Sequence, residues 1–298
     1  MISYANINIE NNTLFWKYIA ERYNIYLKRK KGLPPPWTED RLLQQYKFTN
    51  VFRDLDPGTI YVQEKILPRC ANLTEAVFNI IIYRLFNKIS TFEYHGIQSI
   101  KDFNQKELET RIRELSKTAK VFTNAFIVSG YATIPGKDKI SKVCNIISSI
   151  HSKLPSLIKA ISYNPTSQKT FEEIIKLEGI GRFLGYQICV DIGYYDKKIY
   201  DESSHVVCGP GCINGLNRLF NKPLSGKEYD EAIIFLEKIQ YDEFKKISID
   251  QEKLFSDRKN KYLNLMALEN CLCEFSKYMK ALKGEGRPRN KYTSKYLV

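Results

Sequence analysis

The chain has 298 residues, and 43% of them are hydrophobic, a composition that is typical of a globular protein and excludes an intrinsically disordered one. Lysine and arginine number 46 against 33 acidic residues, and the resulting net charge of +13 favours a polyanionic partner such as nucleic acid. The sequence lacks both a run of about 18 uncharged apolar residues and the pattern of a signal peptide, so we expect no membrane partner and a cytoplasmic location.

Apolar residues recur every three to four positions along most of the chain, which predicts helices. The first spans about 11–28, and the next begins near Thr38-Glu39-Asp40, after the break at Pro34-Pro35-Pro36. A long helix from Asp250 to Lys283 ends at Gly284. The remaining predicted helices span about 58–67, 73–89, 104–127, 138–151, 154–162 and 168–177.

Strict alternation of apolar and polar residues is rare, so we expect an all-α protein with little sheet. Three parts are predicted along the chain. They are an N-terminal helix with a basic segment (1–33), a helical domain (34–285) and a basic C-terminal tail (286–298).

The stretch 174–190 fits the pattern of a helix-hairpin-helix. Gly179 and Gly181 permit a tight turn and leave backbone N–H groups uncovered, where the start of the next helix can receive a DNA phosphate. Gly185 stands where the two helices cross. The alternative is an ordinary turn between helices. The predicted DNA-binding residues of the turn are Gly179, Ile180, Gly181 and Arg182.

This stretch resembles the hairpin of the helix-hairpin-helix DNA glycosylases, in which an essential aspartate lies eighteen residues after the position of the lysine of lyase-type members. Here Phe183 stands at the lysine position and Asp201 at the aspartate position. The resemblance therefore implies that Asp201 is the catalytic carboxylate, with Glu202 as the other candidate. Without the lysine no Schiff base can form there, which predicts hydrolysis, with the carboxylate stabilising positive charge on the sugar. The alternative is a solvated pair of acids in a loop.

Seven cysteines and three histidines give little scope for a metal site. The odd number of cysteines argues against a complete disulfide framework, and their spacings contain no Cys-x2-Cys pair. We therefore expect no metal, no iron–sulfur cluster and no other cofactor. We also expect a monomer.

Four further stretches point to one branch of this superfamily. They are Pro36-Trp37-Thr38-Glu39-Asp40 with residues 46–56, residues 82–92, residues 208–216 and residues 268–278. Together they resemble the helical module of phage 5-hydroxymethyluracil DNA kinases and the α-glutamyl/putrescinyl-thymine pyrophosphorylases, a module also present in anti-phage glycosylases for glucosylated hydroxymethylcytosine. The resemblance runs from about Pro34 to Tyr292. It implies a helix-hairpin-helix glycosylase-like fold, with two helical lobes and a cleft between them, and double-stranded DNA with modified bases as the partner.

Polar residues at helical spacing in these stretches are candidates for a pocket around an everted base. For Asn50, Arg53 and Asp56 the alternative is a helix cap with a surface salt bridge. For Arg84 and Asn87, on an otherwise apolar helix, it is a buried polar network. The predicted base-pocket residues are Phe48, Asn50, Arg53, Asp56, Arg84 and Asn87.

Two other groups of residues in these stretches are candidates for contacts. Gly209 and Gly211 are expected to bring the backbone close to the DNA, and a plain loop is the alternative. Glu269, Cys273 and Lys277 share one helix face, where packing and capping across the lobes is the expected role.

The first functional hypothesis is a monofunctional DNA glycosylase for a hypermodified or glucosylated hydroxymethyl pyrimidine, in the setting of anti-phage defence. The alternative is a thymine-hypermodifying transferase that acts on pyrophosphorylated 5-hydroxymethyluracil in DNA, with the same carboxylate as a base. A third hypothesis is a DNA-binding module without chemistry. Because the sequence contains no P-loop motif, we do not expect phosphate transfer from ATP by this chain alone.

Overall fold

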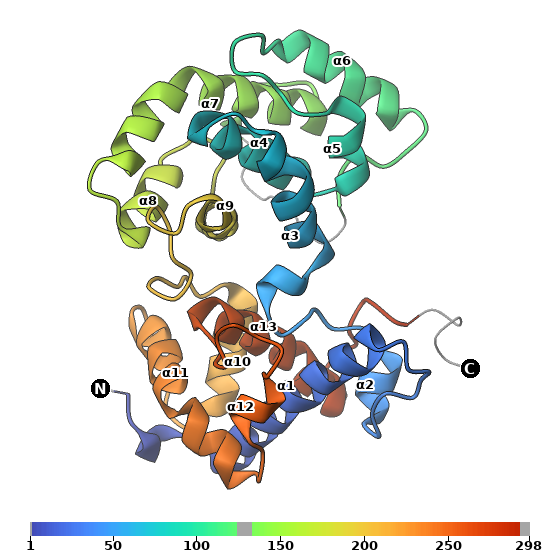
Figure 1. The fold of residues 1–298 in the computed structure, drawn as a ribbon, viewed down its shortest axis with the longest axis vertical. Helices are drawn as coiled ribbons and strands as arrows, with labels where there is room; N and C mark the ends of the chain where they lie inside the picture. The colour runs from blue at the N-terminus through green and yellow to red at the C-terminus, as the bar shows by residue number, and fades with distance from the viewer. Residues whose placement is uncertain (1, 124–132, 293–298) are drawn as a thin grey trace. The chain divides into compact units, whose positions relative to one another are not determined.

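The computed structural model describes residues 2–123 and 133–292, in which helices are joined by loops and turns. No β-strand forms in them, and two isolated bridges join Ile7 to Phe220 and Tyr46 to Lys291. The predicted all-α class is therefore confirmed. The helices form two compact units (Figure 1). Unit 1 comprises the described residues of 1–56 and 206–298, and unit 2 comprises those of 57–205.

Unit 1 is built from both ends of the chain. Its elements are η1 (Tyr4–Asn6), α1 (Ile9–Lys30), α2 (Arg41–Gln45), η2 (Arg53–Leu55), α10 (Pro210–Leu219), α11 (Glu228–Lys246), α12 (Gln251–Leu254) and α13 (Leu265–Leu282). The Asn8 side chain caps α1 by accepting a hydrogen bond from the Asn11 N–H. The fully buried ring of Phe15 on α1 lies 5.2 Å from that of Phe275 on α13. The predicted N-terminal segment thus supplies part of the core of unit 1.

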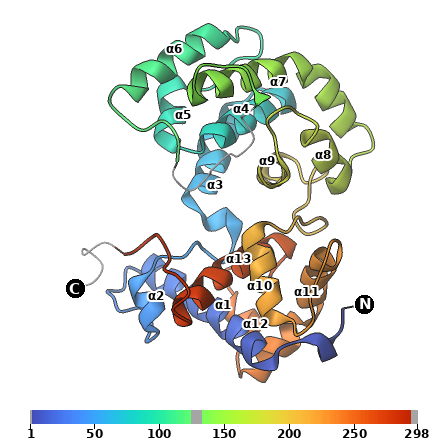
Figure 2. The same cartoon turned by 180° about the vertical axis from the view of Figure 1, so that it is seen from behind.

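Helices α10 and α13 pack directly against each other, as both views show (Figures 1 and 2). Two glycines on α10 make this close approach geometrically possible. A Cβ on Gly215 would lie 2.4 Å from the Leu272 carbonyl oxygen, and one on Gly211 would lie 2.3 Å from the Cys273 sulfur. Gly211 was expected to bring the backbone close to DNA, and in the structure the close neighbour of its backbone is α13.

We expect Gly215→Ala to lower the free energy of unfolding by about 1–3 kcal/mol, because the backbone of α13 leaves no room for the methyl group. Urea unfolding followed by circular dichroism measures the change. Gly286→Ala is the matched control, since a Cβ there meets its nearest neighbour, Lys280, at an ordinary 4.0 Å. Equal stability of the two variants would contradict the packing argument.

Unit 2 is a continuous segment of chain. Its elements are α3 (Pro57–Tyr61), η3 (Val62–Ile66), η4 (Leu67–Arg69), α4 (Leu73–Phe86), α5 (Ile89–His95), α6 (Gln105–Ser116), α7 (Lys139–Ser162), α8 (Ser167–Ile174) and α9 (Arg182–Tyr195). Helix α4 is buried along most of its length and contacts both α7 and α9. No helix in the described ranges is long and apolar enough to span a membrane.

Four predicted helices differ from the observed ones. The predicted helix from Asp250 to Lys283 is wrong, because α12 ends at Leu254 and Asn264 caps a new helix by accepting from the Ala267 N–H. The segments predicted at 138–151 and 154–162 form the single helix α7. Its Pro155 is exposed, so water can satisfy the carbonyl group that proline leaves unpaired. The helix predicted at 104–127 ends at Ser116, and its last four positions lie outside the described residues.

Candidate functional site

The predicted hairpin is present in unit 2, where a tight turn joins α8 to α9. Gly179 adopts a left-handed φ of 78°, while Gly181 has an ordinary φ of −78° and caps α9. Ile180 is buried, whereas Gly181, Arg182 and Phe183 are exposed. A Cβ on Gly185 would lie 2.6 Å from Ile175, as the predicted helix crossing requires. The turn therefore exposes the first residues of α9, which suits a phosphate contact.

Asp201 and Glu202 lie in the loop after α9 and are half-buried. The Asp201 carboxylate accepts a hydrogen bond from the Ser203 N–H (2.9 Å), and its backbone N–H donates to the Ser167 hydroxyl (2.8 Å). Glu202 accepts a hydrogen bond from the Tyr194 hydroxyl (3.2 Å). Both acids thus help to hold the loop, and a catalytic role for either stays a prediction.

Arg84 and Asn87 belong to a buried polar network, which was the alternative to a base pocket for these two residues. The Arg84 guanidinium makes a two-pronged ion pair with Asp191 on α9, with N–O distances of 2.5 and 2.7 Å. It also donates to the side chain of Asn87, which ends α4 in a left-handed conformation with φ 48°. Because both ionic groups are almost completely buried, the pair ties α4 to α9, and the Arg84 guanidinium is taken up by this network.

The remaining base-pocket candidates lie in unit 1, on the segment before and within η2. Phe48 is a core residue that packs on Tyr18 at 5.7 Å. The Asn50 amide donates to the Leu55 carbonyl, and its backbone N–H donates to Asp56. Burial raises the pKa of Asp56, although the Arg53 guanidinium opposes the shift. These polar residues therefore brace the loop against itself. Asn50 does not cap η2, and the Arg53–Asp56 pair is largely buried rather than on the surface, so the cap alternative does not describe them; a contact with a base stays a prediction.

Glu269 on α13 is the most unusual acid of unit 1. Its side chain is buried, at 5% exposure, and its Oε1 accepts a hydrogen bond from the Gly209 N–H (3.3 Å) at the start of α10. Burial raises the pKa of Glu269 to about 7, while the Gly209 N–H and the Arg53 guanidinium oppose the shift. A carboxyl group that titrates near neutral pH can take up or release a proton, as general acid–base catalysis requires.

The sequence-based prediction gave Glu269 a packing and capping role. Glu269 does cap the start of α10, although this contact lies within unit 1. Gly209 was expected to approach DNA, and in the structure its N–H approaches the Glu269 carboxylate. The sequence-based prediction missed the raised pKa of Glu269, although the sequence contained an indication of it. Glu269 follows the core residue Leu268 and precedes another, Leu272, on the same helix, and an acid in an apolar setting has a perturbed pKa.

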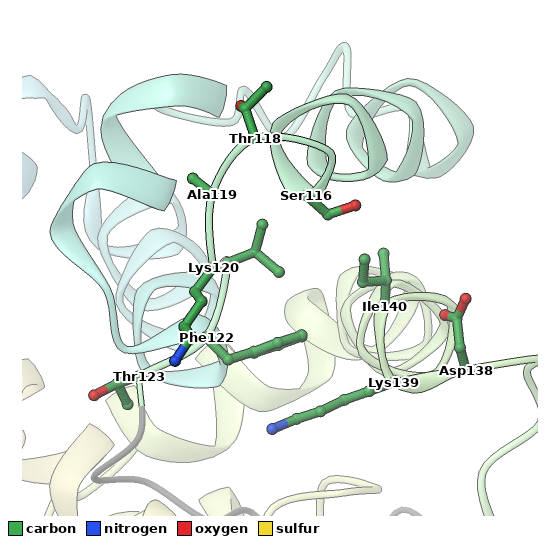
Figure 3. A pocket seen from close by; sticks show the side chains of 10 residues that line it. Ser116, Thr118, Ala119, Lys120, Phe122, Thr123, Asp138, Lys139 and Ile140 are labelled. Carbon is green, nitrogen blue, oxygen red and sulfur yellow. The ribbon is translucent and has the colours of Figure 1, made fainter.

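A hollow of about 770 Å³ lies in unit 2, between the segment after α6 and the start of α7 (Figure 3). The Lys139 ammonium lies 4.2 Å from the centre of the Phe122 ring, and burial lowers the pKa of this lysine. Asp138 at the rim is paired with Arg113. An aromatic face with one amine specifies no ligand class. Among the described residues, no group of three or more His, Cys, Asp or Glu side chains could hold a metal ion.

Comparisons with known proteins identify the family. The family model of the 5-hmdU DNA kinase helical domain matches residues 10–287. A 5-hmdU DNA kinase of Bacillus phage SP10 is 24% identical over 286 residues, which cover 89% of this chain and 44% of the relative. The chain thus spans less than half the length of that kinase. No solved structure matches the chain significantly.

These matches overturn the first functional hypothesis. The relative is named a kinase, which is a transferase, so the prediction of a hydrolytic DNA glycosylase is wrong. The prediction of hydrolysis rested on a resemblance of the hairpin alone, and a shared local fold does not determine which reaction an enzyme performs. With 278 of the 298 residues matched by the family model, the chain belongs to the family of the 5-hmdU DNA kinase helical domain.

Proposed function

We propose that this protein is a transferase that modifies 5-hydroxymethyluracil in DNA at its hydroxymethyl arm. The observation that carries the proposal is the family match over residues 10–287, together with a relative named for its action on 5-hmdU DNA. This is the class of the alternative given above, in which the glycosidic bond stays intact and the base becomes heavier.

Glu269 supplies the chemistry for such a transfer. A nucleophile attacks more readily as its proton leaves, and a base with a pKa near the working pH is best suited to accept that proton. The buried Glu269 carboxyl has this pKa, of about 7. Its Oε1 is held by the Gly209 N–H, and no hydrogen bond to its Oε2 is formed within the described ranges. In the proposed step, the O–H or N–H bond of the nucleophile breaks and its proton passes to Oε2. The nucleophile's oxygen then bonds to the γ-phosphorus of ATP as ADP leaves, or its nitrogen bonds to the hydroxymethyl carbon as pyrophosphate leaves.

Product analysis tests the proposed function. The protein is incubated with duplex DNA that contains 5-hydroxymethyluracil, free or pyrophosphorylated, and with ATP or an amine as the second substrate. The nucleosides are then measured by mass spectrometry. We expect a heavier nucleoside in which base and sugar remain joined. Unchanged DNA that is nevertheless bound would instead indicate a recognition module, and loss of the base would restore the glycosylase hypothesis.

The net charge of +13 and the exposed turn at Gly181 support binding of the DNA backbone. We expect Gly179→Ala to weaken binding of all DNA sequences alike by about tenfold, since losing one charge-assisted phosphate contact amounts to about 1.4 kcal/mol or more. The methyl group is strained by φ 78° and would lie 2.5 Å from Ile146.

Fluorescence anisotropy with several duplexes measures this loss. Gly32→Ala is the matched control, because its φ of 70° imposes the same backbone strain while open space surrounds the new Cβ. A defect confined to one DNA sequence, or an equal defect in both variants, would argue against the phosphate contact at the turn.

A further inference from the structure

The guanidinium of Arg53 has one edge without a partner. Its Nη1 lies 3.7 Å from Asp56 Oδ2, and the side chain is 14% exposed. Its Nε and Nη2 are buried and make no hydrogen bond within the described part of the chain. These two nitrogens carry parallel N–H bonds, which match the two oxygens of a carboxylate or a phosphate. Buried donors left unpaired are costly, so this edge indicates an oxyanion as its occupant.

Arg22, another arginine of unit 1, lies in a different setting, which suits a bound water molecule. Arg22 Nη2 and the Tyr18 hydroxyl also lack a well-formed hydrogen bond, but the two groups interact with each other, and both residues line a cavity of about 10 Å³, the size of a single water molecule. Arg53 does not line that cavity. Its two free donors share one edge and are parallel, so two oxygens of one oxyanion can accept them, each in good geometry.

No acid in residues 2–123 or 133–292 fills the free edge. Glu269 is near enough for Arg53 to lower its pKa, yet no ion pair joins the two in the residues described. Other charged and titratable groups surround Glu269 from both packed helices and the residue before α10. They are Cys208, Cys212, Cys271, Cys273, Glu274 and Lys277. Lys277 is paired with Glu274, whereas Arg53 has two buried donors without a hydrogen-bond partner in the described part of the chain.

We propose that the free edge of Arg53 is a binding site for a tetrahedral oxyanion of the phosphate class, next to Glu269. As an account of the reaction, this inference rests on the proposed function, in which Arg53 holds a phosphoryl group while Glu269 accepts the proton. Binding of the oxyanion itself requires no DNA, so the binding site and the reaction are tested separately.

Calorimetric titration with inorganic sulfate tests the site, since sulfate has the required shape and does not titrate near neutral pH. We expect Arg53→Gln to weaken sulfate binding at least tenfold. Arg53→Lys should weaken it similarly, because lysine keeps the charge but not the paired donors. Arg41→Gln removes the same charge from an exposed position of unit 1 and should bind sulfate as the unmodified protein does. Equal affinity of Arg53→Lys and the unmodified protein would overturn the proposal and leave an adventitious ion only.

The pH dependence gives a second readout that a purely structural arginine would not change. Above pH 7 Glu269 is ionised and repels the bound anion, so sulfate affinity should fall between pH 6 and pH 8. Glu269→Gln should abolish this fall. A fall that persists unchanged in Glu269→Gln would place the sulfate elsewhere and overturn the site.

DNA distinguishes the two sources of phosphate. If the site holds the transferred group, Arg53→Gln should bind unmodified duplex normally and lose transfer activity. If Arg53→Gln instead weakens all duplexes alike, the occupant is a backbone phosphate, and a site for the transferred group is excluded. Sulfate binding without transfer activity in the unmodified protein would support the oxyanion site while the proposed function fails.

Discussion

Glu269→Gln is expected to lower the rate of base modification by about 10²–10⁴-fold, the usual contribution of a general acid–base group. Glutamine keeps the oxygen that accepts the Gly209 N–H but cannot accept a proton at neutral pH. Binding of DNA should therefore persist. Rates of nucleoside conversion and anisotropy titrations measure the two properties in the same preparation.

Glu237→Gln is the matched control for this variant. Glu237 also lies on a helix of unit 1, and burial also raises its pKa, but it is half-buried and outside the α10–α13 contact. Full activity of Glu269→Gln, or an equal defect in both variants, would remove Glu269 from the mechanism.

The rate of the unmodified protein should depend on pH in a direction that follows from this assignment. A base acts in its ionised form, which is scarce below its pKa of about 7 and predominates above it. We therefore expect kcat/KM to rise about tenfold per pH unit below 7 and to level off above it. A profile that is flat from pH 5 to pH 8 would contradict the role of Glu269.

Asp191→Asn is expected to lower the free energy of unfolding by about 3–5 kcal/mol, because it leaves the Arg84 charge buried without its counter-charge. Arg84→Leu should be similarly destabilising, since the Asp191 carboxylate is then unpaired in the core of unit 2. The double change to apolar residues should be milder than either single one, because no buried charge remains. Urea unfolding of all three variants measures these differences.

The exposed pair of Arg111 and Glu107 on α6 provides the control, with side chains 51% and 58% exposed. Arg111→Gln should change stability by less than about 0.5 kcal/mol, as is usual for surface pairs. A cost below 1 kcal/mol for Asp191→Asn would mean that the buried pair is not what ties α4 to α9.

Local rules predicted much of the fold. The spacing of apolar residues placed the helical segments, and the hairpin pattern placed the turn between α8 and α9, with Gly179 and Gly185 in the conformations their roles need. Helix ends were less predictable. Asn264 can start a helix only if the chain before it unwinds, and tertiary packing rather than local pattern decides that.

The candidate site could not be predicted in the same way. Glu269 and Gly209 are 60 residues apart, and nothing local indicates that α10 begins beside this carboxylate. The sequence shows Gly211 and Gly215, which permit the close approach of α10 to another helix, but it does not show that this helix is α13. The activity was mispredicted for a related reason. A hairpin that grips DNA is shared by enzymes with different reactions, and only the chemistry of the site separates them.

The division of the chain has a consequence for its synthesis. Unit 2 is one uninterrupted segment, so it can fold as soon as residue 205 has left the ribosome. Unit 1 must wait, because α1 needs α13, which is synthesised only after the whole of unit 2. Until then the apolar face of α1, with Phe15 and Trp16, stays uncovered in the nascent protein. Chaperones that hold exposed apolar segments should therefore engage α1, and slow translation of residues 206–282 should prolong that engagement.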